Sequence, residues 1–286
     1  MENVPPSARA ARFPFKNQSV SIEHYENFPV ASLLLPAAER APVGVIYRFA
    51  RSADDFADEG ELAPAERLAR LDAYRTELRG IARGDAPGEP LFAELAQVVR
   101  SRGLPLEPLH DLLDAFSQDV LKPRYADFAE LREYCRRSAN PVGRLLLHLF
   151  GAATPENLAQ SDAVCSALQL ANFWQDVALD YAKGRIYLPQ DEMARFGVGE
   201  AHLAERRCDS AWRALLGFQV ERTRALLRSG APLGRRLPGR IGLEIRATVQ
   251  GGLRVLEKLD AVQFDVFRRR PVLKWTDWPL LLWRAL

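Results

Sequence analysis

The sequence has little of several features that would assign a chain to a common class of proteins. It has three cysteines, Cys135, Cys165 and Cys208, which lie far apart and lack the close Cys/His spacing of a zinc site. We therefore expect buried, free thiols in a reducing cytoplasm. Lys and Arg total 39 against 37 Asp and Glu, and the resulting net charge of +2 gives no field that would favour nucleic acid as a partner.

Long apolar runs are missing as well. No uninterrupted run approaches the roughly 18 residues of a membrane span. Residues 1–16 mix Pro, Arg and Ala without the apolar core of a signal peptide. We expect a disordered leader over residues 1–16 and one helical domain over residues 17–286, located in the cytoplasm.

The C-terminal segment has a different character. Trp278 and Trp283 enclose a short apolar stretch that follows the basic run Arg268 to Arg270. Two interpretations remain open, a peripheral contact at the inner face of a membrane and a last helix packed on the domain.

Apolar residues recur at helical spacing through most of the chain, and we find no convincing strand. Examples are Leu109, Leu112, Leu113 and Phe116. Prolines and glycines fall between these runs, as expected for the ends of helices. The pattern predicts an all-α, single-domain helical bundle.

One predicted helix contains an interruption. Asp127 followed by Glu130 has the spacing of a helix start. Pro141 lacks an amide hydrogen and crowds the preceding turn, so we expect a kink with Ser138 to Asn140 at the bend. A kink of this kind opens space inside a bundle.

The first acidic segment contains Asp54, Asp55 and Asp58. At about 100° per residue, Asp54 and Asp58 share a helix face, and Asp55 lies on the adjoining one. Like charges so close need a cation, which Arg51 provides in part. From this segment alone, a metal site and an ordinary solvated acidic face remain equally open.

The second acidic segment is more specific. Asn172, Asp176 and Asp180 place three oxygen donors in one row along a helix. Neighbouring apolar residues, among them Phe173, Trp174, Val177 and Leu179, suggest that the row faces a cavity. Carboxylates in such a place need a partner, and Mg²⁺ fits this donor set best. The alternative is a polar helix face on which Asp180 pairs with Lys183.

Two such rows facing each other would hold Mg²⁺ and a diphosphate between them. Charge accumulates on the diphosphate as its bond to carbon breaks, and Arg51, Lys183 and Arg185 are placed to stabilise it. A carbocation left behind needs a dry pocket with aromatic faces. The candidates are Phe28, Phe49, Phe56, Tyr134, Phe173 and Trp174.

At these residues the sequence resembles the squalene/phytoene synthase family. The matching residues run in family order: Arg51, Asp54, Asp55, Asp58, Tyr134, Cys135, Val142, Gly143, Asn172, Asp176, Asp180, Lys183 to Arg185 and Tyr187 to Pro189. The resemblance implies an isoprenoid-synthase helical bundle with a central cavity. It also implies an isoprenoid diphosphate substrate and Mg²⁺ bound by residues among Asp54, Asp55, Asp58, Asn172, Asp176 and Asp180.

Within the family, the stretches around His24 and Asn140 look like bacterial hydroxysqualene synthases of hopanoid pathways. Phytoene and dehydrosqualene synthases usually carry a glycine-containing stretch where Asn140 and Pro141 stand. The resemblance implies that presqualene diphosphate and water give hydroxysqualene without NADPH. It implies substrate contacts from His24, Asn27 and Phe28 and a catalytic role for Tyr134, while His24 could instead cap the entrance helix. Asn140, at the kink, is a candidate to orient the capturing water through its amide, and the alternative is that it only caps the broken helix. Other enzymes of the pathway are candidate partners.

Three alternatives to this reaction remain. The nearest is head-to-head prenyl transfer to squalene, dehydrosqualene or phytoene on the same fold. The second is a helical nucleotide pyrophosphohydrolase, and the third is a helical membrane adaptor without catalytic activity.

Overall fold

The computed structural model describes residues 35–58 and 60–286. In this part of the chain the regular structure is helical, and the one bridge of strand type joins Arg124 to Ile186. The prediction of an all-α fold is confirmed. The predicted leader and the predicted substrate contacts His24, Asn27 and Phe28 lie outside the described residues.

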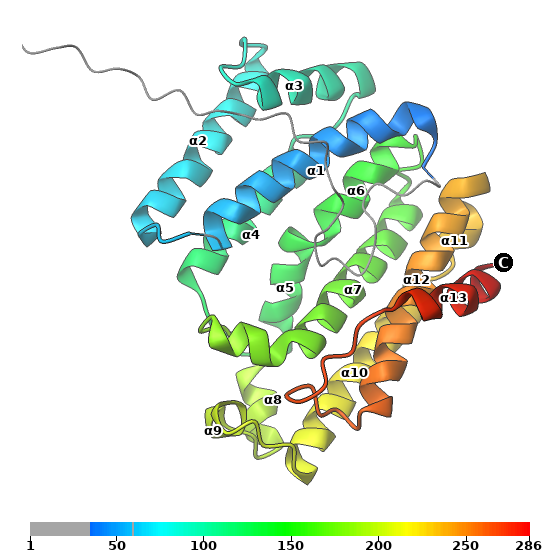
Figure 1. Ribbon diagram of the computed structural model, residues 1–286. Coiled ribbons are helices and arrows are strands. Elements are labelled where there is room, and N and C mark those ends of the chain that lie inside the picture. The colour runs from blue at the N-terminus through cyan, green and yellow to red at the C-terminus, as the bar shows by residue number, and fades with distance from the viewer. Residues whose placement is uncertain (1–34, 59) are drawn as a thin grey trace, which may run out of the picture.

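Figure 1 shows the helices as a layered bundle, with α7 running through its middle. The helices are α1 (Ala37–Asp58), α2 (Pro64–Arg83), α3 (Pro90–Arg102), α4 (Glu107–Leu121), α5 (Phe128–Ser138), α6 (Asn140–Leu149), α7 (Pro155–Ala182), α8 (Gln190–Arg195), α9 (Glu200–Ala204), α10 (Ser210–Gly230), α11 (Leu233–Arg236), α12 (Gly239–Ala261), the short 3₁₀ helix η1 (Trp275–Asp277) and α13 (Trp278–Ala285).

The predicted interruption between α5 and α6 is present. Asp127 caps α5, because its Oδ1 accepts a hydrogen bond of 2.8 Å from the Glu130 amide. α5 ends at Ser138, and α6 begins at Asn140 with Pro141 in its first turn, where the missing amide hydrogen is not needed. The chain thus breaks into two helices at Ala139 instead of bending within one.

Two large groups of buried side chains form the core of the described residues. One lies around α7, α10 and α12 and contains Trp174 and Trp212, and the other lies among α1 to α4 and contains Phe49 and Phe92. α7 packs against α5, α6, α10 and α12. α7 therefore supports side chains on several sides, one of which carries the second acidic row.

The three cysteines are free, as predicted. Cys135 is fully buried, but Cys165 and Cys208 are partly exposed, so the expectation that all three are buried was wrong for two of them.

The contact between α7 and α10 depends on a glycine. A Cβ atom added at Gly230 would lie 2.5 Å from the backbone oxygen of Gln160 and 2.7 Å from Val164 Cγ2. Because the oxygen belongs to the backbone of α7, it cannot move aside without moving the helix. The absence of a side chain at Gly230 is what allows the two helices to approach.

We expect Gly230→Ala to lower the free energy of unfolding by about 1–3 kcal/mol, the cost of overpacking a well-packed contact. Urea denaturation measures this change. Gly44→Ala is the matched control, because the nearest atom to its new Cβ, Arg48 Nη1, is 3.7 Å away. In the interior of α1 this control should be neutral or stabilising by up to about 1 kcal/mol. Equal stability of the two variants would contradict the prediction.

Candidate active site

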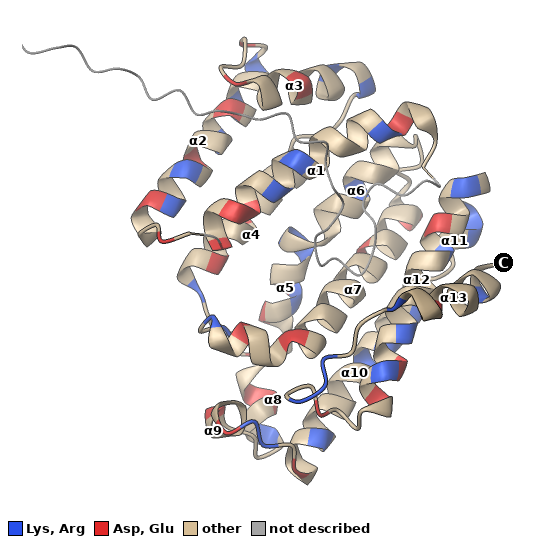
Figure 2. Cartoon of the chain, viewed as in Figure 1, with Lys and Arg blue, Asp and Glu red and all other residues tan. Residues whose placement is uncertain are grey.

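The first acidic segment meets the loop that follows α7. Asp58, in the last turn of α1, forms ion pairs with Lys183 at 2.8 Å and Arg185 at 2.5 Å. Figure 2 colours acidic positions in the C-terminal part of α1 red. Two segments about 125 residues apart are therefore joined at one carboxylate. The alternative pairing of Lys183 with Asp180 is not what the structure shows.

Charge and burial act differently on the carboxylates of α1. Burial works to raise the pKa of Asp58, but the hydrogen bond from Lys183 and the charge of Arg185 outweigh it and lower the pKa. Burial and the neighbouring charge of Asp58 raise the pKa of Asp54 to about 6. Arg51 contacts Asp54 at 3.3 Å and Asp55 at 2.9 Å, as predicted, without restoring the usual pKa of Asp54.

The second acidic row lies in the C-terminal half of α7. Asp176 is bound by the guanidinium of Arg270, with Nη2 at 3.0 Å from Oδ2. Burial, followed by the charge of Asp176, raises the pKa of Asp180 to about 7. Asp58 also contributes to this increase, so the two acidic segments are close enough to repel each other.

The apolar frame predicted for this row is only partly present. Phe173 and Val177 are buried beside it, but Leu179 is half exposed, so the row faces solvent on one side. Trp174 points away from it, and its indole N–H donates to Thr223 Oγ1 of α10 at 2.8 Å. The predictions for Leu179 and Trp174 were wrong, because spacing alone does not say which faces of a central helix meet other helices.

Asp119 is a third buried carboxylate at this place, and sequence analysis missed it. Tyr134 Oη donates to Asp119 Oδ2 at 2.8 Å, while Asp119 Oδ1 is buried and accepts no hydrogen bond from the described residues. Burial is the main cause that raises its pKa to about 7, with Asp58 and Asp54 adding to the increase. Arg185 donates to the backbone oxygen of Asp119 at 3.3 Å.

A cluster of four aromatic rings forms the wall next to these carboxylates. Phe173 and Tyr187 stack with centroids 3.8 Å apart, and Tyr125 and Tyr134 pack around them. Burial, followed by the charge of Asp119, raises the pKa of Tyr134 and keeps its hydroxyl neutral. The structure thus places Tyr134 and Phe173 next to the acidic residues, and their part in the site stays a prediction.

Other predicted aromatic residues lie elsewhere. Phe49 and Phe56 pack against Tyr74 of α2, with centroids 5.6 and 5.2 Å away. Phe28 lies outside the described residues. The aromatic wall is thus built from α5, α7 and the loops around them, and not from α1.

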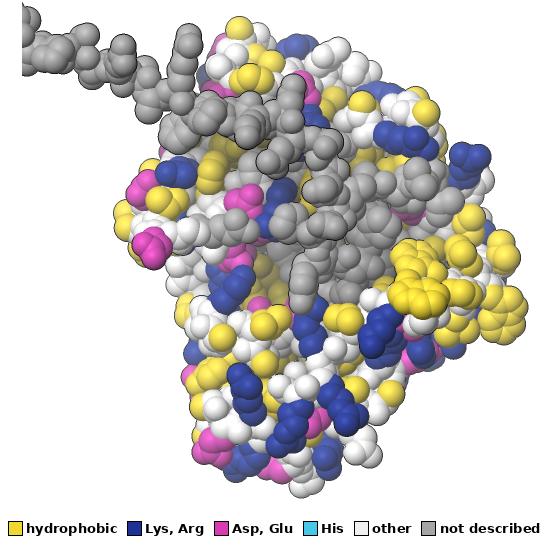
Figure 3. Space-filling model, viewed as in Figure 1, with side chains coloured by type: hydrophobic (Ala, Val, Ile, Leu, Met, Phe, Trp, Pro, Cys, Tyr) yellow, Lys and Arg dark blue, Asp and Glu magenta, His cyan; other side chains and the backbone are white. Residues whose placement is uncertain are grey.

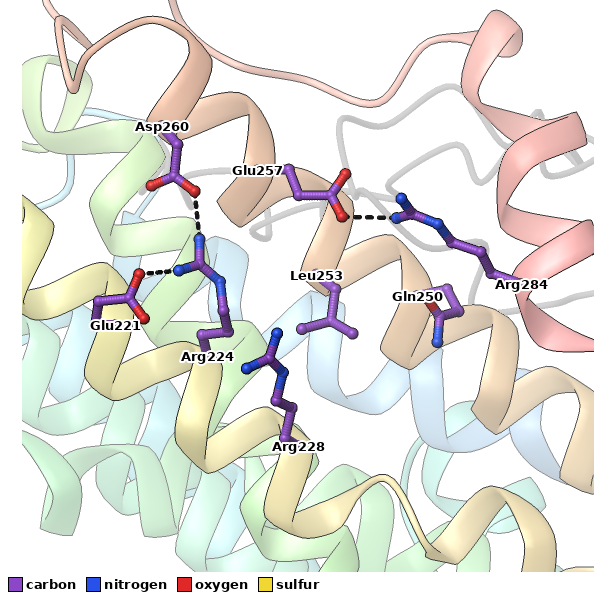
Figure 4. A pocket seen from close by; sticks show the side chains of 8 residues that line it. All are labelled: Glu221, Arg224, Arg228, Gln250, Leu253, Glu257, Asp260 and Arg284. Atoms are coloured by element: carbon purple, nitrogen blue, oxygen red, sulfur yellow. Dashed lines mark hydrogen bonds and ion pairs between the residues drawn. The ribbon is translucent and has the colours of Figure 1, made fainter.

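The described residues line hollows of very different size. A cavity of about 10 Å³, close to the space that one water needs, is lined by Asp180, Arg185, Tyr187 and their apolar neighbours. A groove of about 520 Å³ lies between α10, α12 and α13 (Figure 4). Its charged side chains largely pair with one another, as Arg224 does with Glu221 and Asp260, and none of the predicted site residues lines it.

Asn140 is buried at the start of α6. Its Oδ1 accepts a hydrogen bond of 2.8 Å from Ser166 Oγ of α7, and its side chain does not cap α6. The amide is therefore held in a fixed orientation by α7. Asn172, the first residue of the predicted oxygen row, is half-buried on α7.

The donors of the two acidic segments suit a hard cation such as Mg²⁺ by their chemistry. In residues 35–58 and 60–286, however, no three His, Cys, Asp or Glu side chains converge as a set of metal ligands. Lys183 and Arg185 form ion pairs with Asp58, and Arg270 forms one with Asp176. These basic side chains supply the positive charge that the carboxylates require.

The helical bundle brings the acidic segments of α1 and α7 close together beside basic side chains of two loops, the arrangement expected of the isoprenoid-synthase class of folds. Comparison with known proteins identifies the group within that class. The squalene/phytoene synthase family profile matches residues 22–278, and the chain belongs to this family of enzymes.

Several relatives are similar over most of the chain. A hydroxysqualene synthase of Rhodopseudomonas palustris is 39% identical over 77% of this chain and 74% of its own length. One from Sinorhizobium fredii is 36% identical over 76% and 73%. The crystal structure of a squalene synthase from Alicyclobacillus acidocaldarius has a TM-score of 0.78 and 37% identity, covering 84% of this chain and 90% of that chain.

The raised pKa values make stability depend on pH. A carboxyl with a raised pKa in the folded state stabilises the protein at low pH, and this contribution is lost as the pH rises through the folded pKa. We expect the metal-free protein to lose stability as the pH rises from about 4, near the ordinary carboxyl pKa, to about 7, the folded pKa of Asp119 and Asp180, by at least the roughly 1.4 kcal/mol of one pKa unit.

Asp119→Asn should flatten this dependence, because the amide is neutral at every pH and its oxygen still accepts from Tyr134. Urea denaturation in the presence of a chelator, repeated across this pH range, measures the slope. Asp72→Asn, at an exposed position of α2, is the control and should keep the wild-type slope. A wild-type slope in Asp119→Asn would refute the assignment.

Proposed function

We propose that the chain converts presqualene diphosphate and water to hydroxysqualene and diphosphate, a step of squalene and hopanoid biosynthesis. The observation that carries the proposal is the junction at Asp58, where the acidic segment of α1 meets Lys183 and Arg185. A site of this kind balances the charge of a leaving diphosphate. The similarity to hydroxysqualene synthases over about three quarters of the chain supports the choice of substrate.

The first chemical step is heterolysis of the bond between carbon and the diphosphate oxygen. The electron pair stays on the oxygen, so negative charge grows on the diphosphate and a carbocation remains. Arg51, Lys183 and Arg185 are the basic side chains next to the acidic segments, and they stabilise this charge in the transition state. These basic side chains now pair with Asp54, Asp55 and Asp58. If they bind the substrate diphosphate instead, these carboxylates need another cation.

Asp54, Asp58, Asp176 and Asp180 are the residues that would hold Mg²⁺, with Asp55 and Asn172 as further donors. The raised pKa values of Asp54 and Asp180 fit this role, because burial leaves their ionised forms short of positive charge. Bound Mg²⁺ would supply charge neutralisation for the leaving diphosphate. The exposed side of the α7 row gives access to the site.

The aromatic wall keeps water away from the carbocation until the carbocation has rearranged. Phe173 and Tyr187 present stacked faces beside Asp180 and Arg185. Tyr134, held by Asp119, adds a neutral hydroxyl to this wall. Its fixed orientation suits a role in placing the hydrocarbon relative to the departing diphosphate.

Water capture ends the reaction. The oxygen of a water molecule forms a bond to the cation and releases a proton, and no reductant enters, so NADPH is not expected to be needed. Asn140 orients that water through its amide nitrogen, since the amide oxygen is engaged by Ser166. We place the enzyme in the cytoplasm, where other enzymes of the pathway are its expected partners.

An assay of products tests the substrate. Purified protein with Mg²⁺ should turn presqualene diphosphate into an alcohol at the same rate with and without NADPH. Farnesyl diphosphate alone should remain unconsumed. Gas chromatography with mass detection identifies the products.

Consumption of farnesyl diphosphate together with formation of a head-to-head prenyl product would instead establish head-to-head condensation. In the same assay Asn140→Ala should lower the yield of the alcohol and raise that of hydrocarbons, which form when the cation loses a proton instead of capturing water. An unchanged yield would exclude Asn140 from water capture.

A second test addresses the metal. At a Mg²⁺ concentration of about 100 times the Kd, bound metal should stabilise the wild type by about 2.7 kcal/mol, which raises Tm by about 5 °C. Asp180→Asn should lose most of this increase, and its kcat should fall by about 100-fold or more, because a carboxylate ligand is lost.

Thermal unfolding with and without a chelator measures the first effect, and steady-state kinetics measure the second. Asp72→Asn is again the control and should keep both the Mg²⁺-dependent increase in Tm and the wild-type kcat. A full increase in Tm in Asp180→Asn would show that the metal binds elsewhere.

A further inference from the structure

Exposed apolar side chains are concentrated at the C-terminal end of the described chain. Of the seven large hydrophobic residues that are exposed in the described part of the chain, five belong to the segment from Trp275 to Leu286. The most exposed are Trp275 at 82%, Trp283 at 74% and Leu286 at 92%. Figure 3 shows hydrophobic side chains gathered over α13, with Lys and Arg side chains at the edge of the patch. We call this patch the α13 face: Trp275, Trp278, Leu282, Trp283 and Leu286.

The fold holds the α13 face in place. Leu281 and Ala285, one turn apart, are buried on the inner side of α13, which packs on α12. Asp277, only 5% exposed, binds Arg254 at 3.0 Å and Lys258, and accepts from the Lys274 amide at 2.7 Å. Burial works to raise its pKa, but these partners outweigh it and lower the pKa to about 2. The tryptophans therefore project from an anchored helix and not from a frayed end.

The charge around the α13 face is positive. Residues 265–286 contain five basic and two acidic residues, a net charge of +3, which exceeds the +2 of the whole chain. Arg268, Arg269 and Lys274 are exposed next to the aromatic segment. Tryptophan beside basic residues is the composition of segments that lie at a bilayer interface, where the indole is amphipathic and the cations meet anionic head groups.

The dimensions favour a segment that lies on a membrane. α13 has eight residues and so a length of about 12 Å, well short of the roughly 30 Å of a bilayer core. None of the helices in the described part of the chain is long and apolar enough to cross a bilayer.

We propose that the α13 face docks on the head-group region of a bilayer that contains anionic lipids. The tryptophans enter the interface, and Arg269 and Lys274 contact lipid phosphates. Arg270, in the same loop, turns inward to Asp176, so the surface and the candidate site share one short segment. The proposal concerns binding and does not depend on which reaction the enzyme catalyses.

Vesicle flotation of the full chain tests the proposal without any substrate. Wild-type protein should float with vesicles of phosphatidylcholine mixed with phosphatidylglycerol, and less with phosphatidylcholine alone or at high salt. Trp275→Ser combined with Trp283→Ser should lower the partition coefficient roughly tenfold or more. Arg269→Gln combined with Lys274→Gln should lower it by about fivefold for each residue on the anionic vesicles only.

Leu121→Ser is the matched control, because Leu121 is 65% exposed at the end of α4 and outside the α13 face. It should bind vesicles as the wild type does. Failure of the wild type to bind anionic vesicles, or full binding by the tryptophan variant, would overturn the proposal. So would sedimentation equilibrium without lipid that shows a dimer for the wild type and a monomer for the tryptophan variant, because the face would then join two copies of the chain.

Discussion

The contact of Asp58 with Lys183 and Arg185 is the interaction on which the candidate site depends. It joins the end of α1, in one half of the bundle, to the loop after α7, in the other. Burial and the charge of Asp58 already raise the pKa values of Asp54, Asp119 and Asp180, and without these two cations the charge of Asp58 would have no compensating charge. The basic groups that pair with Asp58 are those that a diphosphate would engage, so the ion pairs keep these groups at the candidate site.

The carboxylates of the candidate site differ in how far positive charge balances their negative charge. Asp58 and Asp176 have basic partners, whereas burial dominates at Asp119 and Asp180. A buried carboxylate without sufficient positive charge costs stability at neutral pH. Proteins retain such a cost at positions where the ionised form is needed for function. Here the cost falls on Asp119 and Asp180, which lie beside Arg185 and the aromatic wall. In the proposed function, the carboxylates that would bind a cation are therefore those that cost stability when no cation is bound.

Sequence analysis predicted what depends on local spacing. The acidic faces of α1 and α7, the pairing of Arg51 and the break before Asn140 all follow from helical periodicity or from proline chemistry. Asp119 has no motif around it, although it continues the apolar stripe of Leu112 and Phe116, where an acid is unexpected. Arg270 comes from a loop, and no periodic pattern could pair it with Asp176. Trp174 was misplaced because α7 is covered on several sides, and only the packed structure says which side meets α10.

The loop before α13 connects the candidate site to the α13 face. Its Pro271 carbonyl accepts a hydrogen bond from Gln175 of α7, and its Arg270 binds Asp176, the next residue of α7. A few residues later the chain reaches Trp275 and the anchored helix α13. The segment that carries the α13 face therefore also supplies the side chain that pairs with Asp176. Any coupling between the two surfaces would have to be reciprocal: competition with Arg270 for Asp176 would change membrane binding only if membrane binding also changed the pair of Arg270 and Asp176.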